Sequence, residues 1–412
     1  MADVIMLFGS FVFLVLFAFL LFVFIVFLLS RFMSKEYPDY EPEVSIVVPA
    51  YNEEKNISDC INSIRNLHYP KSKIDIIVVD DGSTDKTKSI VAGFDDVKLI
   101  EQNHEGKAEA LNAGAKNARH DLVITIDADS VLDRESIREL VKPLQDPTIA
   151  ASSGSCKVRN IKNLLTIFQN VEYLYNNIIR NSFTNVFRAG IWFFGALACY
   201  RKSVLEEVGY FKKDTLAEDA DIALEINKAG FRTFHAHRAF CLTEVPEKIS
   251  ELYSQRRRWC VGVLQALVKN RSLFSTKSSP STIFLFVSQF WWSFYSLISP
   301  LLIIYQIIYW MPSPVFLEIL SYLFRWFSLL GPLYVIYKIP EWGISIYSFF
   351  GVLAGIISAA LIISAIKIFK DKLNISNTFA LFFYFPYTII LNMMIASGMV
   401  AYFFTKKRYF IG

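Results

Sequence analysis

The sequence predicts an α/β domain with a doubly wound parallel sheet, inserted between helices that span a membrane. Two observations lead to this fold class. Hydrophobic residues make up 53% of the 412 residues and form long runs near both ends of the chain, which is more than water-soluble domains usually contain. Between these runs, short β-branched segments alternate with amphipathic ones, a pattern typical of parallel strands joined by helices.

The first apolar run covers residues 4–29 and contains no charged residue. At about 1.5 Å per helical residue, it is long enough to cross a hydrocarbon core of about 30 Å. It lacks the basic start and the small-residue cleavage site of a signal peptide, so we expect a transmembrane helix. Arg31 and Lys35 follow directly, and the positive-inside rule therefore places the next segment in the cytoplasm.

Four short segments predict strands of a cytoplasmic domain over residues 40–245. They are residues 44–49, 74–80, 97–100 and 122–127. Parallel sheets of this kind bind ligands at the carboxyl ends of their strands, where the chain enters the loops. The chemistry of the domain is therefore expected at that edge.

Long apolar runs return at residues 282–309, 315–337, 342–366 and 377–403. Strict alternation of four spans would place the lysines at 367, 370 and 372 outside, which conflicts with the positive-inside rule. We therefore expect about four transmembrane or interfacial helices over residues 282–403. The chain as a whole is predicted to be a multi-pass protein of the cell membrane, in contact with membrane lipids.

The distribution of charge and cysteine excludes several classes of function. The net charge of +4 arises in residues 281–412, where eight basic residues outnumber three acidic ones, while residues 31–280 are neutral. Nucleic acid is not an expected partner, because phosphate recognition needs basic residues concentrated on the recognising domain. The five cysteines occur singly, which disfavours a disulfide framework or a cysteine zinc site.

Polar residues follow the first two predicted strands. Tyr51 and Glu53 come after one strand, and Asp80 and Asp81 end the next. Acidic groups there suit hydrogen bonds to a nucleotide base and ribose, although a helix cap followed by a turn explains the second group equally well. Lys107 begins a predicted helix, where it is either a phosphate-binding cation or an exposed lysine.

The triplet Asp127-Ala128-Asp129 closes the fourth strand. The two-residue period of a strand predicts that both carboxylates point to the same side of the sheet. Such hard oxygens suit Mg²⁺ or Mn²⁺, which would neutralise a diphosphate leaving group. Triplets of this kind are also common by chance.

Glu218 and Asp219 stand just before an amphipathic segment. A carboxylate at a helix start fits an N-cap, and it also fits a general base that removes a proton from an acceptor hydroxyl. Both interpretations remain open at this point.

Residues 246–275 predict an amphipathic helix at the membrane interface. Gln255, Arg258 and Trp259 form a stripe separate from the apolar face. This stripe either points into the catalytic domain or anchors the helix at lipid headgroups. The apolar face comprises Ile249, Leu252, Tyr253, Cys260, Val263, Leu264 and Leu267.

These motifs, in this order and between membrane segments, resemble the membrane-embedded family 2 glycosyltransferases, which include cellulose, hyaluronan, chitin and poly-N-acetylglucosamine synthases. The resemblance covers residues 1–280 by motif and the tail only by hydropathy. The sequence segments TLAEDADIAL, TEVPE and QRRRW are most similar to those of the poly-N-acetylglucosamine synthase branch. A cellulose-type gating loop is not recognisable after the last motif, which disfavours cellulose as the product.

The resemblance implies a GT-A-type fold and a role for each motif. Asp219 would be the base, with Glu218 beside it, and Asp129 would bind the metal together with Asp127. The residues implied in binding the nucleotide sugar are Tyr51, Glu53, Asp80, Asp81, Lys107 and Asp127. The residues implied at the acceptor are Gln255, Arg258 and Trp259 of the QxxRW motif, and Gly195 in the segment 191–196.

The function implied is an inverting transfer of N-acetylglucosamine or a related hexose from a UDP-sugar to a growing β-linked polysaccharide, coupled to export. Mg²⁺ or Mn²⁺ would be the cofactor. The alternative is a non-processive transfer of one sugar to a membrane lipid. A third hypothesis, a binding protein without activity, is disfavoured because Asp127, Asp129, Asp219 and Arg258 are all present.

Overall fold

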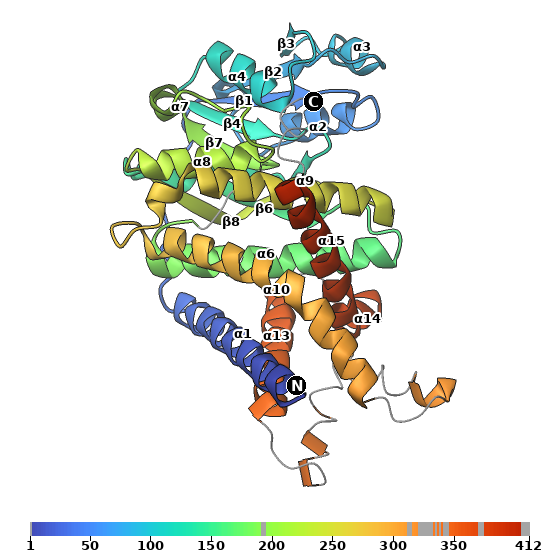
Figure 1. Cartoon of the computed structure of the whole chain (residues 1–412). Helices are drawn as coiled ribbons and strands as arrows, with labels where there is room; N and C mark the ends of the chain where they lie inside the picture. The colour runs from blue at the N-terminus through green and yellow to red at the C-terminus, as the bar shows by residue number, and fades with distance from the viewer. Residues whose placement is uncertain are drawn as a thin grey trace.

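The computed structural model describes residues 2–190, 195–310, 315–319, 346–369 and 375–404, together with residues 333, 336, 337, 339 and 340. A mixed α/β domain lies at one end of the molecule and a group of long apolar helices at the other (Figure 1). The strands are β1 (Val44–Ala50), β2 (Ile74–Asp80), β3 (Val97–Glu101), β4 (Leu122–Ile126), β5 (Val131–Leu132), β6 (Ile149–Val158), β7 (Leu197–Arg201) and β8 (Arg232–Thr243).

The helices of the α/β domain are α2 (Ile57–Arg65), α3 (Thr87–Val91), α4 (Lys107–Asn117), α5 (Ser136–Val141), α6 (Leu164–Phe187), α7 (Lys202–Val208) and α8 (Glu218–Lys228). Short 3-10 turns occur at η1 (Lys71–Lys73), η2 (Lys142–Gln145) and η3 (Arg271–Leu273). The remaining helices are α1 (Ala2–Ser30), α9 (Ile249–Lys269), α10 (Pro280–Trp310), α13 (Ile346–Ile368), α14 (Ile375–Phe382) and α15 (Tyr384–Phe404).

The sheet has eight strands in the order β3-β2-β1-β4-β7-β6-β8-β5. The four strands predicted from the sequence are confirmed, and they pair in parallel as β3-β2-β1-β4. The predicted parallel pairing holds for these four strands but not for the whole sheet, because β7 is antiparallel to both β4 and β6, and β5 is antiparallel to β8. The sheet is therefore mixed, with a parallel half that carries the predicted strand ends.

Both faces of the sheet are covered by helices, as a doubly wound fold requires. Successive residues of β1 point to opposite faces, so Ile46 packs with Ile61 of α2 and Leu140 of α5. Val47 instead packs on the other face with Leu111 of α4 and Ile222 of α8.

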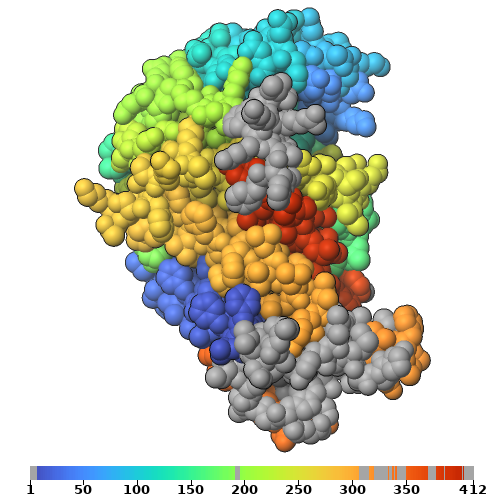
Figure 2. Space-filling model, viewed as in Figure 1, coloured from blue at the N-terminus to red at the C-terminus, as the bar shows by residue number. Residues whose placement is uncertain are grey.

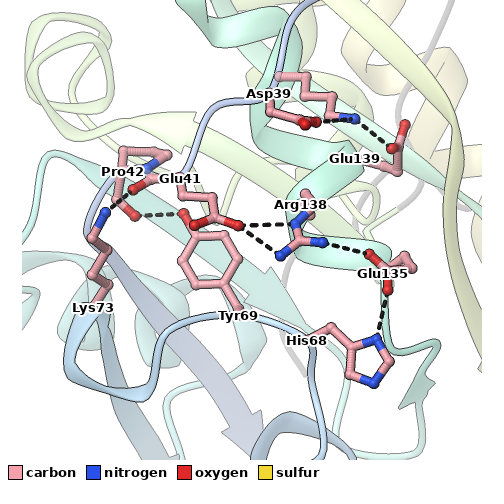
Figure 3. A network of polar contacts seen from close by, with 10 residues as sticks. Asp39, Glu41, Pro42, His68, Tyr69, Lys73, Glu135, Arg138 and Glu139 are labelled. Carbon is pink, nitrogen blue, oxygen red and sulfur yellow. Dashed lines mark hydrogen bonds and ion pairs between the residues drawn. The ribbon is translucent and has the colours of Figure 1, made fainter.

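The extended segment between α1 and β1 is fixed to the α/β domain by polar contacts (Figure 3). Glu41 forms an ion pair of 2.7 Å with Arg138, which also contacts Glu135. Asp39 lies 3.0 Å from Lys142, and Lys73 donates to the carbonyl of Glu41 at 2.6 Å. Because α1 directly precedes this segment, these contacts restrict how the domain can move relative to α1.

Among the residues that the structure describes, three helical segments are long and apolar enough to cross a membrane: Leu7–Ser30, Pro280–Tyr305 and Phe349–Ile368. The first confirms the predicted helix over residues 4–29. The predicted run 377–403 is divided into α14 and α15, and the run 315–337 lies mostly outside the described residues.

Helix α6 lies between the sheet and these apolar helices, and α9 lies beside α8 and α15 (Figure 1). The surface seen in Figure 2 accordingly passes from the blue and green of the α/β domain through yellow to the orange and red of α10 and α15. One apolar cluster joins Phe27 of α1, Leu174 of α6, Leu252 of α9, Ile362 of α13 and Met394 of α15. The α/β domain and the apolar helices thus share a packed core.

Candidate active site

The predicted site residues gather where β1, β2 and β4 end and α4 and α8 begin. Lys107, the first residue of α4, connects them. Its Nζ lies 2.6 Å from Asp127 Oδ1 beyond β4 and 3.1 Å from Glu218 Oε1 at the start of α8. Gly106 has a φ of 93°, a conformation that a glycine adopts without strain, and it turns the chain so that α4 can begin at Lys107.

Asp219 lies in the first turn of α8, and both of its carboxylate oxygens accept backbone hydrogen bonds. Gly195 N–H donates to Oδ2 at 2.9 Å, and Ala220 N–H donates to Oδ1 at 2.8 Å. The N-cap of α8 is Ala217, so Asp219 is not the capping residue that the sequence allowed. Its carboxylate is instead held at a defined position at the helix start.

The charge state of Asp219 depends on its burial and its neighbours. Burial and the charge of Glu218 raise the pKa of Asp219 to about 6, although Lys107 opposes the shift. Burial acts on Glu218 in the same direction, but Lys107 prevails and lowers the pKa of that carboxyl. The pKa of Asp219 is thus raised while that of the adjacent Glu218 is lowered, which makes Asp219 the better proton acceptor near neutral pH.

Asp127 and Asp129 occupy a turn rather than the strand itself. β4 ends at Ile126, and Ser130 N–H donates to Asp127 O at 2.9 Å, so strand periodicity does not set the directions of these two side chains. Asp127 pairs with Lys107, whereas Asp129 accepts hydrogen bonds from Ser130 at 3.1 Å and from Thr243 of β8 at 3.3 Å.

Asp129 fits a divalent cation by its chemistry. Burial and the nearby charges of Asp127 and Glu53 raise the pKa of Asp129 to about 7, and a bound cation would relieve this crowding of negative charge. Within the described part of the chain, no three His, Cys, Asp or Glu side chains form a metal-binding group. A cation here would therefore depend on oxygens of a ligand or of water as well.

The acids after β2 face the loop that precedes Lys107. Asp81 is 3% exposed, and its carboxylate accepts hydrogen bonds from Gln102 Nε2 at 2.6 Å and from the N–H groups of Glu105 and Gly106, both at 2.9 Å. Asp80 is also buried and accepts from Ser83 N–H at 3.3 Å. In this structure Asp81 therefore fixes the loop that presents Lys107.

Tyr51 and Glu53 lie on the same side of the site as Asp80 and Asp81. The Tyr51 ring stacks on His104 with 4.0 Å between the ring centroids, and Glu53 accepts a hydrogen bond from Asn56 at 3.1 Å. Burial raises the pKa of Glu53.

The QxxRW motif lies on α9, against the catalytic domain. Trp259 packs against the apolar core on the α2 face of the sheet, so it is not a headgroup anchor. The positive charge of Arg258 reaches Glu218 and contributes to lowering its pKa, while Gln255 is half-buried. Gly195 contacts Asp219, and residues 191–194 lie outside the described residues.

Part of the predicted apolar face of α9 packs on other helices. Leu252 and Leu267 are buried in the cluster shared with α1, α6 and α13, whereas Ile249 at the start of the helix is 61% exposed. The position of α9 at the membrane interface therefore stays a prediction.

A buried ion pair that the sequence pattern did not reveal lies beneath the motif. Both terminal nitrogens of Arg256 donate to the carboxylate of Glu172 on α6. Tyr387 of α15 donates to the same carboxylate at 2.7 Å, and the guanidinium lies 4.6 Å from the Trp259 ring centroid. Glu172, an acid among the largely apolar residues of segment 164–187, is the signal in the sequence that could have found it.

Residues 45–209 match the family model Glycosyl transferase family 2. This part of the chain, from β1 to the end of α7, is therefore similar to the family 2 glycosyl transferases.

Particular relatives have a more specific name. A poly-beta-1,6-N-acetyl-D-glucosamine synthase of Staphylococcus epidermidis is 31% identical over 234 residues, which are 55% of this chain and 56% of that protein. The protein of the same name from Staphylococcus aureus strain COL is 29% identical over 267 residues, 62% of this chain and 64% of that one. The matched regions thus span less than two thirds of the curated relatives.

A solved structure extends the similarity of fold over the apolar helices. The mannosyltransferase of Pyrobaculum calidifontis, in complex with GDP-Man and Mn²⁺, covers 97% of this chain and 100% of its own, with a TM-score of 0.62 and 22% identity. The chain therefore has the GT-A-like fold with flanking apolar helices.

Proposed function

We propose that this chain is an inverting glycosyltransferase of the cell membrane that transfers N-acetylglucosamine or a related hexose from a UDP-sugar to a growing β-linked polysaccharide. The observation that carries the proposal is the half-buried Asp219 carboxylate, held by two backbone N–H groups beside the Lys107 cation and the Asp127–Asp129 turn. The sugar is suggested by the names of the curated relatives.

In this mechanism Asp219 accepts the proton of the acceptor hydroxyl as the hydroxyl oxygen forms a bond to the anomeric carbon. The bond between that carbon and the diphosphate breaks on the opposite side, and UDP leaves with the electron pair. Lys107 supplies a positive charge near the diphosphate. In addition, it restrains Asp127 and Glu218.

Mg²⁺ or Mn²⁺ would be held by Asp129, with Asp127 beside it. When bound, it would neutralise charge that develops on the diphosphate. Tyr51, Glu53, Asp80 and Asp81 are proposed to form the nucleotide side of the site. Gln255, Arg258, Trp259 and Gly195 are proposed to form the acceptor side.

The membrane arrangement is also a proposal. The catalytic domain over residues 40–245 is proposed to be cytoplasmic, with residues 246–275 at the interface and with several helices spanning the bilayer. Three candidate spans and the basic residues Arg31 and Lys35 after α1 support a multi-pass protein with this orientation.

The test is sugar transfer by the purified protein in lipid vesicles. Radiolabelled UDP-N-acetylglucosamine, UDP-glucose and GDP-mannose are supplied separately with Mn²⁺ or Mg²⁺, and the product is sized. We expect long products from UDP-N-acetylglucosamine, whereas one sugar on a lipid would establish the non-processive alternative. Transfer from none of the donors contradicts the proposal.

The metal is tested in the same assay. We expect EDTA and Asp129→Asn each to abolish transfer, and Mn²⁺ or Mg²⁺ to restore only the EDTA-treated wild type. Full activity in EDTA would reject the metal.

A further inference from the structure

Helix α9 lies directly against the segment that leads to Asp219. A Cβ added at Gly262 would lie 2.6 Å from Ala217 N and 2.7 Å from both Ala217 Cβ and Leu216 C. Two of these three atoms belong to backbone and cannot move like the end of a flexible side chain. Residue 262 must therefore be glycine for α9 to approach this closely.

A buried hydrogen bond fixes the same contact one helical turn later. Gln265 is 8% exposed, and its Oε1 accepts a hydrogen bond from Leu216 N–H at 2.9 Å. The bond determines the position of the backbone that precedes the N-cap Ala217 and, two residues further on, Asp219.

The C-terminal end of α9 contacts residues on either side of Asp219 in the sequence. Lys269 Nζ lies 2.6 Å from Asp221 Oδ2 and 3.0 Å from Asp214 Oδ1, and Asn270 donates to Asp221 Oδ1 at 3.1 Å. The contacts of α9 thus bracket Asp219, from residue 214 to residue 221.

The opposite side of α9 is packed on α15 and α6, so the helix has a fixed support. Ser397 of α15 donates to the Tyr253 hydroxyl at 3.2 Å. Gly398 lies close to the backbone of Arg257, because a Cβ added at Gly398 would lie 3.5 Å from Arg257 Cα. The buried Arg256–Glu172 pair fixes the same part of the helix from α6.

We infer that Gly262 and Gln265 are positioning residues for Asp219: they set the distance between α9 and the segment 216–219 and thereby place the carboxylate against the acceptor hydroxyl. This role rests on the proposed function, in which Asp219 is the base. The contacts described for both residues are with Leu216 and Ala217, so we expect their effect on the reaction to pass through Asp219.

The variants Gly262→Ala and Gln265→Leu test this role. Alanine is a better helix former than glycine, so a loss of turnover in Gly262→Ala cannot come from a weaker helix. A displacement of about 1 Å at a reacting group can lower the rate by about a hundredfold. We expect kcat for sugar transfer to fall by about ten- to a hundredfold in each variant, with UDP affinity unchanged.

Gly351→Ala is the matched control. A Cβ at Gly351, on α13, would meet only Phe13 carbons at 3.8 and 3.9 Å, which is ordinary contact. This variant should keep the wild-type kcat.

A double mutant separates positioning from general damage. If Gly262 and Gln265 act through Asp219, each substitution should cause no further loss of kcat in an Asp219→Asn background. A loss that multiplies with that of Asp219→Asn overturns the inference, and so does wild-type turnover in both single variants. A wild-type protein that transfers no sugar contradicts the proposed function itself, which is measured first in the same assay.

Discussion

The substitution Asp219→Asn separates a catalytic role of this residue from a structural one. Both carboxylate oxygens accept backbone N–H groups, from Gly195 at 2.9 Å and Ala220 at 2.8 Å. Asparagine has a single acceptor oxygen and an NH₂ group of donors. One of the two backbone N–H groups therefore loses its acceptor in the variant.

Two effects of this variant can be estimated, one on the free energy of unfolding and one on kcat. A buried donor left without an acceptor costs about 1–3 kcal/mol, so the free energy of unfolding should fall by about that amount. Loss of the base should lower kcat by about 10²- to 10⁴-fold. The structural effect alone leaves most molecules folded, so it cannot produce a loss of turnover of that size.

The assay uses one purified preparation for sugar transfer, UDP affinity and thermal unfolding. Glu225→Gln, which neutralises a carboxylate further along α8, is the control and should turn over like wild type. If Asp219→Asn loses stability but retains turnover within a few-fold of wild type, Asp219 is a structural residue and the mechanism has no base.

Three further predictions concern the pH dependence of turnover, the buried Arg256–Glu172 pair and the membrane topology. Because the pKa of Asp219 is about 6 and its ionised form is the base, kcat/KM should fall as the pH decreases through 6, to about a tenth of the pH 7 value at pH 5; an activity constant down to pH 4.5 would reject this assignment. The side chains of Arg256 and Glu172 are 9% and 11% exposed. Arg256→Met leaves the Glu172 charge buried without its partner, so it should lower the free energy of unfolding in detergent by about 3–5 kcal/mol. The exposed pair Arg65–Asp96 is its control, since Arg65→Met should have a much smaller effect. A reporter fused near Thr276 should be cytoplasmic, because Arg31 and Lys35 follow α1, and external labelling there would refute the proposed topology.

Much of the architecture could be predicted from the sequence because it depends on local patterns. The β-branched runs at 44–49 and 74–80 form β1 and β2 almost as predicted, and the uncharged run at 4–29 forms α1. In contrast, β6 has the sequence IAASSGSCKV, whose small and polar residues have little strand propensity. Its place in the sheet depends on pairing with β7 and β8, which the chain alone does not indicate.

The site shows the same division. The predicted strands indicated that chemistry would lie at the carboxyl edge of the sheet, and the family resemblance implied that Asp127, Lys107 and Glu218 belong to one site. The sequence did not indicate which charges would pair, that Asp127 and Asp129 would lie in a turn, or that Asp81 would bind a loop of its own chain.

The composition and order of the motifs by themselves determined that this protein has a GT-A-like α/β domain between apolar helices. Only the tertiary structure decided how the acidity of Asp219 and Glu218 is separated and how α9 is supported, because both depend on side chains far apart in sequence. Glu172, Arg256 and Tyr387 meet in one buried network, and Gly262 meets Ala217 across two helices. Burial and close packing are properties of the folded chain, so no local pattern could specify them.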